Sequence, residues 1–184
     1  MPSDKDRLYV ALYARGGAPT MPGLEDTYHW AFIVGPKSES GTSQGFRFHA
    51  KERLSFVGNP PVAQSVWQYE ETEIFMAPSS MLLVRIMVGK VKSIDRLRSI
   101  FERTPVRPEI DGWNCVAWVK EALLAAIQDS RALGTSAGGW QEVRDTAMLY
   151  VKRKKEAHRF DGTVYFDPTQ AATWDMLSGV ELVP

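Results

Sequence analysis

The chain has 184 residues, and its 22 Lys and Arg balance its 22 Asp and Glu, so the formal net charge is zero. Its length and its 44% content of hydrophobic residues predict a single domain over residues 1–184 that buries a substantial core. The neutral balance argues against a dedicated nucleic-acid binder, and the single Cys excludes an internal disulfide and a Cys-based zinc cage.

The first half of the chain is predicted to form strands separated by turn residues. The turns are marked by Gly16-Gly17, Gly35-Pro36 and Asn59-Pro60-Pro61. Between them, five segments are rich in β-branched and aromatic residues, which favour strands. The predicted strands cover residues 8–13, 28–34, 46–50, 67–75 and 81–88.

The second half is predicted to be mainly helical. Apolar residues recur at helical spacing over residues 93–103, 114–128 and 140–158. Ser93 is a candidate N-cap for the first helix and Asp111 for the second, and the tail from Asp161 reads as irregular. Together, the two halves predict an α+β fold in which an antiparallel sheet of about five strands packs against helices.

Sequence signals for membrane insertion and secretion are weak. The first six residues are polar, and no apolar segment follows a basic start, so no secretory signal peptide is expected. The most apolar run, residues 81–88, is interrupted by Arg85 and is too short to span a bilayer. We therefore expect a cytoplasmic protein with no stable membrane insertion and no nucleic-acid partner.

Cys115 lies in the first turn of the predicted middle helix, after Gly112-Trp113-Asn114. Unpaired N–H groups and the positive end of the helix dipole stabilise a thiolate there, and the same N–H groups can hold an oxyanion during acyl transfer. The alternative interpretation is structural, because a lone Cys is commonly a small buried hydrophobe.

Two of the three imidazoles lie on neighbouring predicted strands. A thiol nucleophile needs an imidazole to accept its proton and a further group to orient that imidazole. Strand alternation places His29 on the face of Ala31 and Ile33, and hairpin pairing can bring His49 close to it. The alternative interpretation of His29 and of His49 is structural: each would only satisfy a local hydrogen bond in or near the core. His158 follows a basic run at a helix end, where solvation explains it.

Three segments, taken in order, resemble one family. His29-Trp30-Ala31-Phe32-Ile33-Val34-Gly35, Phe48-His49-Ala50 and Asn114-Cys115-Val116-Ala117-Trp118-Val119 resemble the permuted NlpC/P60-like (papain-like) thiol enzymes. The nearest pattern is that of the lecithin:retinol acyltransferase and H-Ras-like suppressor acyltransferase group. The likeness covers roughly residues 25–52 and 112–125, and Val116-Ala117-Trp118 replaces that group's Glu-His-Phe.

The resemblance implies a permuted papain-like fold and a Cys-His-His site with no cofactor and no metal. It implies Cys115 as nucleophile, His29 as general base and His49 as the residue that orients His29. Asn114 matches the residue before the nucleophile, without an assigned chemical role. Candidate substrate contacts near these positions are Trp30, Trp113, Asn114 and Trp118.

The sequence therefore predicts a soluble enzyme that acts on an amide, ester or thioester through an acyl-thioester intermediate. It would be a hydrolase if water resolves the intermediate and an acyltransferase if an amine or alcohol does, and its partner would be a small-molecule or peptide acyl substrate. The alternative from another class is a non-catalytic binding module that keeps the papain-like fold. Glu70, Glu71 and Glu73 share one predicted strand and offer no carboxylate pair for glycoside chemistry.

Overall fold

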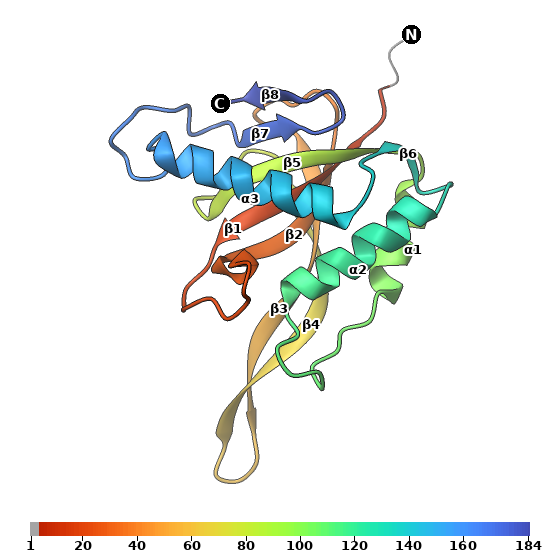
Figure 1. Cartoon of the computed structure of the whole chain (residues 1–184). Helices are drawn as coiled ribbons and strands as arrows, with labels where there is room; N and C mark the ends of the chain where they lie inside the picture. The colour runs from red at the N-terminus through yellow and green to blue at the C-terminus, as the bar shows by residue number, and fades with distance from the viewer. Residues whose placement is uncertain (1–3) are drawn as a thin grey trace.

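The computed structural model describes residues 4–184, in which three α-helices lie against one face of an eight-stranded sheet (Figure 1). The α+β prediction is confirmed. Residues 1–3, which belong to the polar start of the chain and to the predicted domain, lie outside the described part. The strands are β1 (Arg7–Ala14), β2 (Tyr28–Gly35), β3 (Gln44–Val57), β4 (Val62–Phe75), β5 (Leu82–Val91), β6 (Leu133–Ser136), β7 (Ala172–Asp175) and β8 (Val180–Val183).

The helices are α1 (Ile94–Arg103), α2 (Cys115–Gln128) and α3 (Trp140–Glu156), and the 3-10 turn Glu25–Thr27 precedes β2. The predicted Ser93 cap is confirmed, because its side chain accepts from the Arg96 N–H at 3.2 Å. The Asp111 cap is wrong: the N-cap of α2 is Asn114. Among residues 4–184, no helix has both the length and the apolar character that a membrane crossing requires.

The sheet is larger than predicted and mixed, with the order β4-β3-β2-β1-β5-β7-β8 and with β6 paired to β5. The five expected strands correspond to β1–β5. The prediction missed β6, β7 and β8 because each has only four residues, too few to establish an alternating pattern. The expectation of a purely antiparallel sheet is also wrong, because β7 runs parallel to β5.

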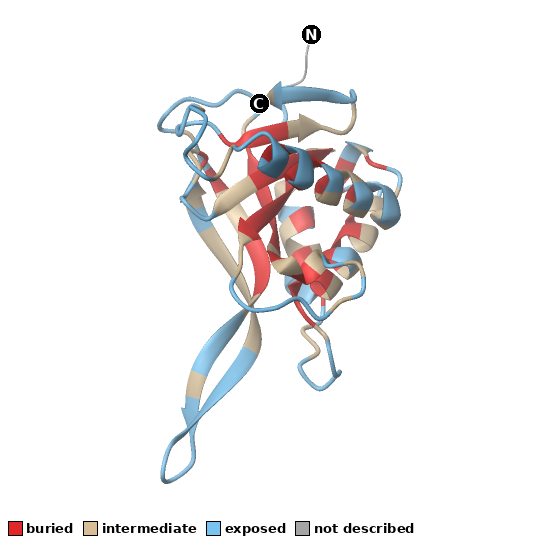
Figure 2. Ribbon diagram, turned by 60° about the vertical axis from the view of Figure 1, so that its left-hand side comes forward, coloured by how far each residue is buried: buried red, intermediate tan, exposed pale blue. Residues whose placement is uncertain are grey.

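Strands β3 and β4 form a hairpin that extends well beyond the body of the domain (Figure 2). The prediction placed β3 at residues 46–50 only, because charged residues such as Lys51 and Arg53 follow and disguise the continuing strand. In the projecting arm, Leu54 and Phe56 are exposed. Their ladder partners are Ser65 and Ala63.

The two faces of the sheet are covered differently. The main core lies between the sheet and the helices, where Leu12, Trp30 and Phe32 pack with α1, α2 and α3. A smaller cluster on the opposite face contains Tyr13, Ala31 and Ile33. Because side chains alternate along a strand, one residue step in β2 moves a side chain from one face to the other.

Candidate functional site

Cys115 is the first residue of α2 and has 0% of its surface exposed. The Asn114 side-chain oxygen accepts hydrogen bonds from the backbone N–H of Val116 at 2.9 Å and of Ala117 at 3.4 Å. This capping fixes the start of the helix and the place of the thiol. It also occupies two of the first-turn donors that the sequence suggested for an oxyanion.

His29, His49 and Glu70 form a hydrogen-bonded chain across β2, β3 and β4. His29 Nε2 lies 2.7 Å from His49 Nδ1, and His49 Nε2 lies 3.1 Å from Glu70 Oε1. The expected approach of His49 to His29 is therefore present. Glu70 is the member that sequence reasoning missed: it stands directly opposite His49 in the β3–β4 register, but the register was not readable from the residues.

The histidines project to the face opposite the helices, as alternation predicted for His29. Its ring centroid lies 6.2 Å from that of Tyr13, which belongs to the smaller cluster on that face. Cys115, in contrast, belongs to the main core on the helix side. Within residues 4–184, no hydrogen bond joins the Cys115 thiol to His29 or His49.

The thiol nevertheless reaches the strand that carries His29. The backbone N–H of Trp30, the next residue, lies close enough to the Cys115 thiol to favour its thiolate form. Strands β2 and β3 pair only at Phe32↔Phe48, Ile33↔Arg47 and Val34↔Phe46, so the N-terminal half of β2 is not paired with β3. Cys115 thus contacts β2 in the unpaired half that also holds His29.

Burial and the nearby charges set the protonation states of His29, His49 and Glu70. Burial lowers the pKa of His29 to about 3, with a further contribution from His49. Burial also lowers the pKa of His49 to about 4, although its hydrogen bond to Glu70 opposes the shift. For Glu70, burial is outweighed by hydrogen bonds with Lys51 and His49, and its pKa falls to about 2. At neutral pH both imidazoles are neutral and Glu70 is a carboxylate.

These charge states determine which ring nitrogens carry protons. A carboxylate only accepts, so His49 Nε2–H donates to Glu70 Oε1. The neutral His49 then accepts at Nδ1, and the donor is His29 Nε2–H. His29 is left with an unprotonated Nδ1 that can accept a proton.

The thiol departs from the expectation based on its helix position. Burial raises the pKa of Cys115 above its ordinary value, and hydrogen bonds from the backbone of Trp30 and of the first α2 residues offset this only in part. Desolvation therefore outweighs the helix N-terminus. The resting thiol is protonated at neutral pH.

Two of the expected substrate contacts are core residues in this structure. Trp118 has 0% exposure, packs against Phe32 and Phe101, and donates Nε1–H to the Thr104 carbonyl at 3.3 Å. Trp30 is also fully buried, and its Nε1–H donates to the Glu25 carbonyl at 2.8 Å. Like Cys115, both lack exposed surface, so their contact with substrate stays a prediction.

Trp113 and Asn114 occupy different positions from these core residues. Trp113 is half-buried, and its ring packs edge-on against Trp67 with centroids 5.7 Å apart. Asn114 is 7% exposed and donates Nδ2–H to Met21 Sδ at 3.4 Å. Met21, from the β1–β2 loop, therefore lies beside the start of α2. Of the four predicted contacts, Trp113 has the most accessible surface.

Two other polar residues noted in the sequence have structural partners. Asp26 accepts from the Thr20 N–H at 2.7 Å and from the Met21 N–H at 3.1 Å, which fixes the β1–β2 loop. His158 is exposed and pairs with Asp161 at 2.6 Å between Nδ1 and Oδ2. Neither residue joins the His29, His49 and Glu70 chain.

Two cavities lie near the site without including the thiol. A pocket of about 250 Å³ on the face opposite the helices is lined by Tyr13 and Arg47, among others. A wide groove of about 1400 Å³ is lined by Arg15, Thr27 and Tyr28 together with the loop after α3. Neither is lined by Cys115, and because Cys115 has no exposed surface, a substrate can reach the thiol only if covering side chains move.

The chain matches one known protein family. No curated protein and no solved structure matches it. One family model, described as a family of unknown function (DUF6914), matches residues 5–183. That match covers nearly the whole sequence, and the chain therefore belongs to the DUF6914 family.

Proposed function

We propose that the chain is a cysteine-nucleophile enzyme that acts on an amide, ester or thioester through an acyl-thioester intermediate, within a permuted papain-like fold. The observation that carries the proposal is the chain from Glu70 through His49 to His29, which leaves His29 Nδ1 free to accept a proton. It ends beside Trp30, whose N–H contacts the thiol.

The proposed reaction starts from the neutral thiol and the neutral imidazole. His29 Nδ1 takes the Sγ proton as sulfur attacks the substrate carbonyl carbon, and the resulting imidazolium donates through His49 toward Glu70. The same proton then passes to the leaving amine, alcohol or thiol as the acyl-thioester forms. Water, or an amine or alcohol, resolves the thioester with His29 again as base. For the first step, the Cys115 and His29 side chains must turn toward each other across β2.

One observation favours the second candidate, a non-catalytic binding module. Cys115 has no exposed surface, and burial raises the pKa of its thiol. These are the properties of a structural cysteine as well as of a covered nucleophile. The two candidates differ in whether the thiol, with help from His29, takes the acyl group from a donor that reaches it.

Acetylation of Cys115 by an activated ester distinguishes the enzyme from the binding module. The chain is incubated with p-nitrophenyl acetate, and intact-mass spectrometry measures the acetyl adduct and its site. The enzyme predicts an adduct on Cys115 that is absent in Cys115→Ala and forms at least about tenfold more slowly in His29→Ala. His158→Ala is the matched control, because that imidazole is exposed and outside the chain. An adduct that forms equally fast in wild type and His29→Ala contradicts the enzyme and favours the module.

A further inference from the structure

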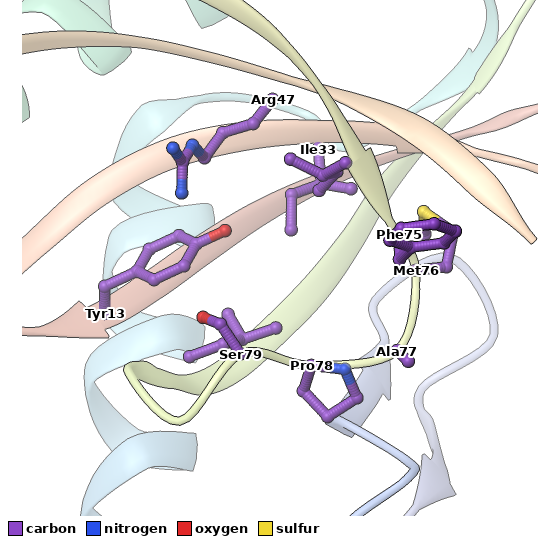
Figure 3. Close-up of a pocket in the computed structure, with 10 residues that line it drawn as sticks. Tyr13, Ile33, Arg47, Phe75, Met76, Ala77, Pro78 and Ser79 are labelled. Atoms are coloured by element: carbon purple, nitrogen blue, oxygen red, sulfur yellow. The ribbon is translucent and has the colours of Figure 1, made fainter. Parts of the chain in front are cut away.

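The pocket of about 250 Å³ has an apolar body and a polar end. The apolar lining comes from three strands, with Ile33 in β2, Ile74 in β4 and Leu82 in β5. Tyr13 and Arg47 lie together at the polar end (Figure 3). The volume lies just below the range of roughly 300–1,000 Å³ that is typical of drug-sized ligands. The pocket therefore fits a molecule smaller than these, with an apolar part and a polar group at one end.

The charge at the polar end is positive. Arg47 Nη2 lies 3.9 Å from Glu70 Oε1, but the same carboxylate also binds Lys51 and His49. One carboxylate thus faces two permanent cations, and the histidine is neutral at pH 7 because its pKa is about 4. The excess positive charge favours an anion in the pocket.

Arg47 also has unused hydrogen-bonding capacity. Its Nε is buried and has no hydrogen-bond partner within residues 4–184. Its guanidinium carbon lies 5.5 Å from the Tyr13 ring centroid, so the phenol and the guanidinium border the same space. A second guanidinium on this face, that of Arg85, also has a buried nitrogen without a partner, Nη1, but it is paired with Glu39 at 2.8 Å and does not line the pocket. Arg47 is therefore the cation that lines the pocket, and 26% of its side chain is exposed.

We propose that this pocket binds a small amphipathic carboxylate. The carboxylate accepts hydrogen bonds from the Arg47 guanidinium, which suits two-pronged recognition of such a group, and from the Tyr13 hydroxyl. Its apolar chain lies on Ile33, Ile74 and Leu82. The site does not depend on the chemistry proposed for Cys115, because Cys115 is not part of its lining.

Isothermal titration calorimetry with octanoate tests the proposal. Wild type is expected to bind one octanoate per chain, at least about tenfold more tightly than 1-octanol, octylammonium or acetate, because only octanoate offers both groups. Arg47→Gln removes most of the preference over 1-octanol, and Arg47→Lys restores part of it. Arg53→Gln is the matched control: it makes the same charge change on the exposed hairpin arm and leaves binding unchanged.

Further variants separate this site from the proposed enzyme. Ala77→Trp places a bulky group on the pocket lining and abolishes octanoate binding, whereas Cys115→Ala binds octanoate as wild type does. Circular dichroism confirms that each variant is folded. The proposal is overturned if octanoate does not bind, if 1-octanol binds equally well, or if Arg47→Gln and Arg53→Gln weaken binding to the same extent.

Discussion

Replacing both His29 and His49 with Gln removes two imidazoles that the fold holds in the neutral form. In the folded chain their pKa values are about 3 and about 4, against an ordinary 6.5. Below pH 6.5 the unfolded chain therefore binds protons that the folded chain does not. The stability that depends on keeping both imidazoles neutral is fully present above pH 6.5. It is lost as the pH falls toward the folded pKa values.

The size of the effect follows from linkage. Each histidine lowers the free energy of unfolding by about 2 kcal/mol between pH 8 and pH 5, and this figure changes little for any folded pKa at or below about 4. The pair therefore contributes about 2–4 kcal/mol, where the lower figure allows for the partial exposure of His29. Glu70 adds little in this window because its folded pKa of about 2 and its ordinary value of 4.5 both lie below pH 5.

Urea denaturation at pH 8 and at pH 5 measures this contribution. The wild-type midpoint is expected to fall by roughly 1–2 M more than that of the double variant, given a slope of about 2 kcal/mol per molar urea. His158→Gln, at an exposed position, serves as the control and retains the wild-type dependence. A double variant that loses stability as steeply as wild type would show that these two histidines do not cause the pH dependence.

Three further changes test other parts of the structure. Glu70→Gln removes the carboxylate that fixes the His49 tautomer, and acetylation of Cys115 is expected to slow by about tenfold or more; an unchanged rate would detach Glu70 from the site. Asn114→Ala removes the cap of α2 and costs about 1 kcal/mol in urea denaturation, whereas Asn114→Asp recovers most of it; equal losses would exclude the cap as the cause. Trp118→Ala empties a core position and costs about 3–5 kcal/mol, clearly more than Trp113→Ala at its half-buried site; the reverse order would contradict the core assignment.

The sequence predicted the elements with strong local patterns. Ser93 and the apolar spacing after it located α1, and the alternation in residues 28–34 placed His29 on the face opposite Trp30. It did not predict β6, β7 and β8, because four-residue strands depend on their partners in the sheet. The length of the hairpin arm was hidden for a similar reason, since its ladder continues through charged and exposed residues.

The site was only partly predictable. The closeness of His29 and His49 followed from hairpin pairing, but the partnership with Glu70 depends on a register that only the folded sheet defines. The thiol pKa was expected to fall at a helix N-terminus, and burial raises it instead. Burial depends on the packing of distant segments, such as the β1–β2 loop that carries Met21, and local sequence does not encode it.

The central claim is that neutral His29 takes the proton from Cys115, and the pH dependence of Cys115 acetylation tests it most directly. A base whose pKa is about 3 is fully available across neutral pH, so the wild-type rate is expected to change by less than about threefold between pH 6 and pH 8. Without that base, reaction needs the thiolate, and the rate in His29→Gln should rise about tenfold per pH unit. Equal tenfold slopes in the two proteins would contradict the account.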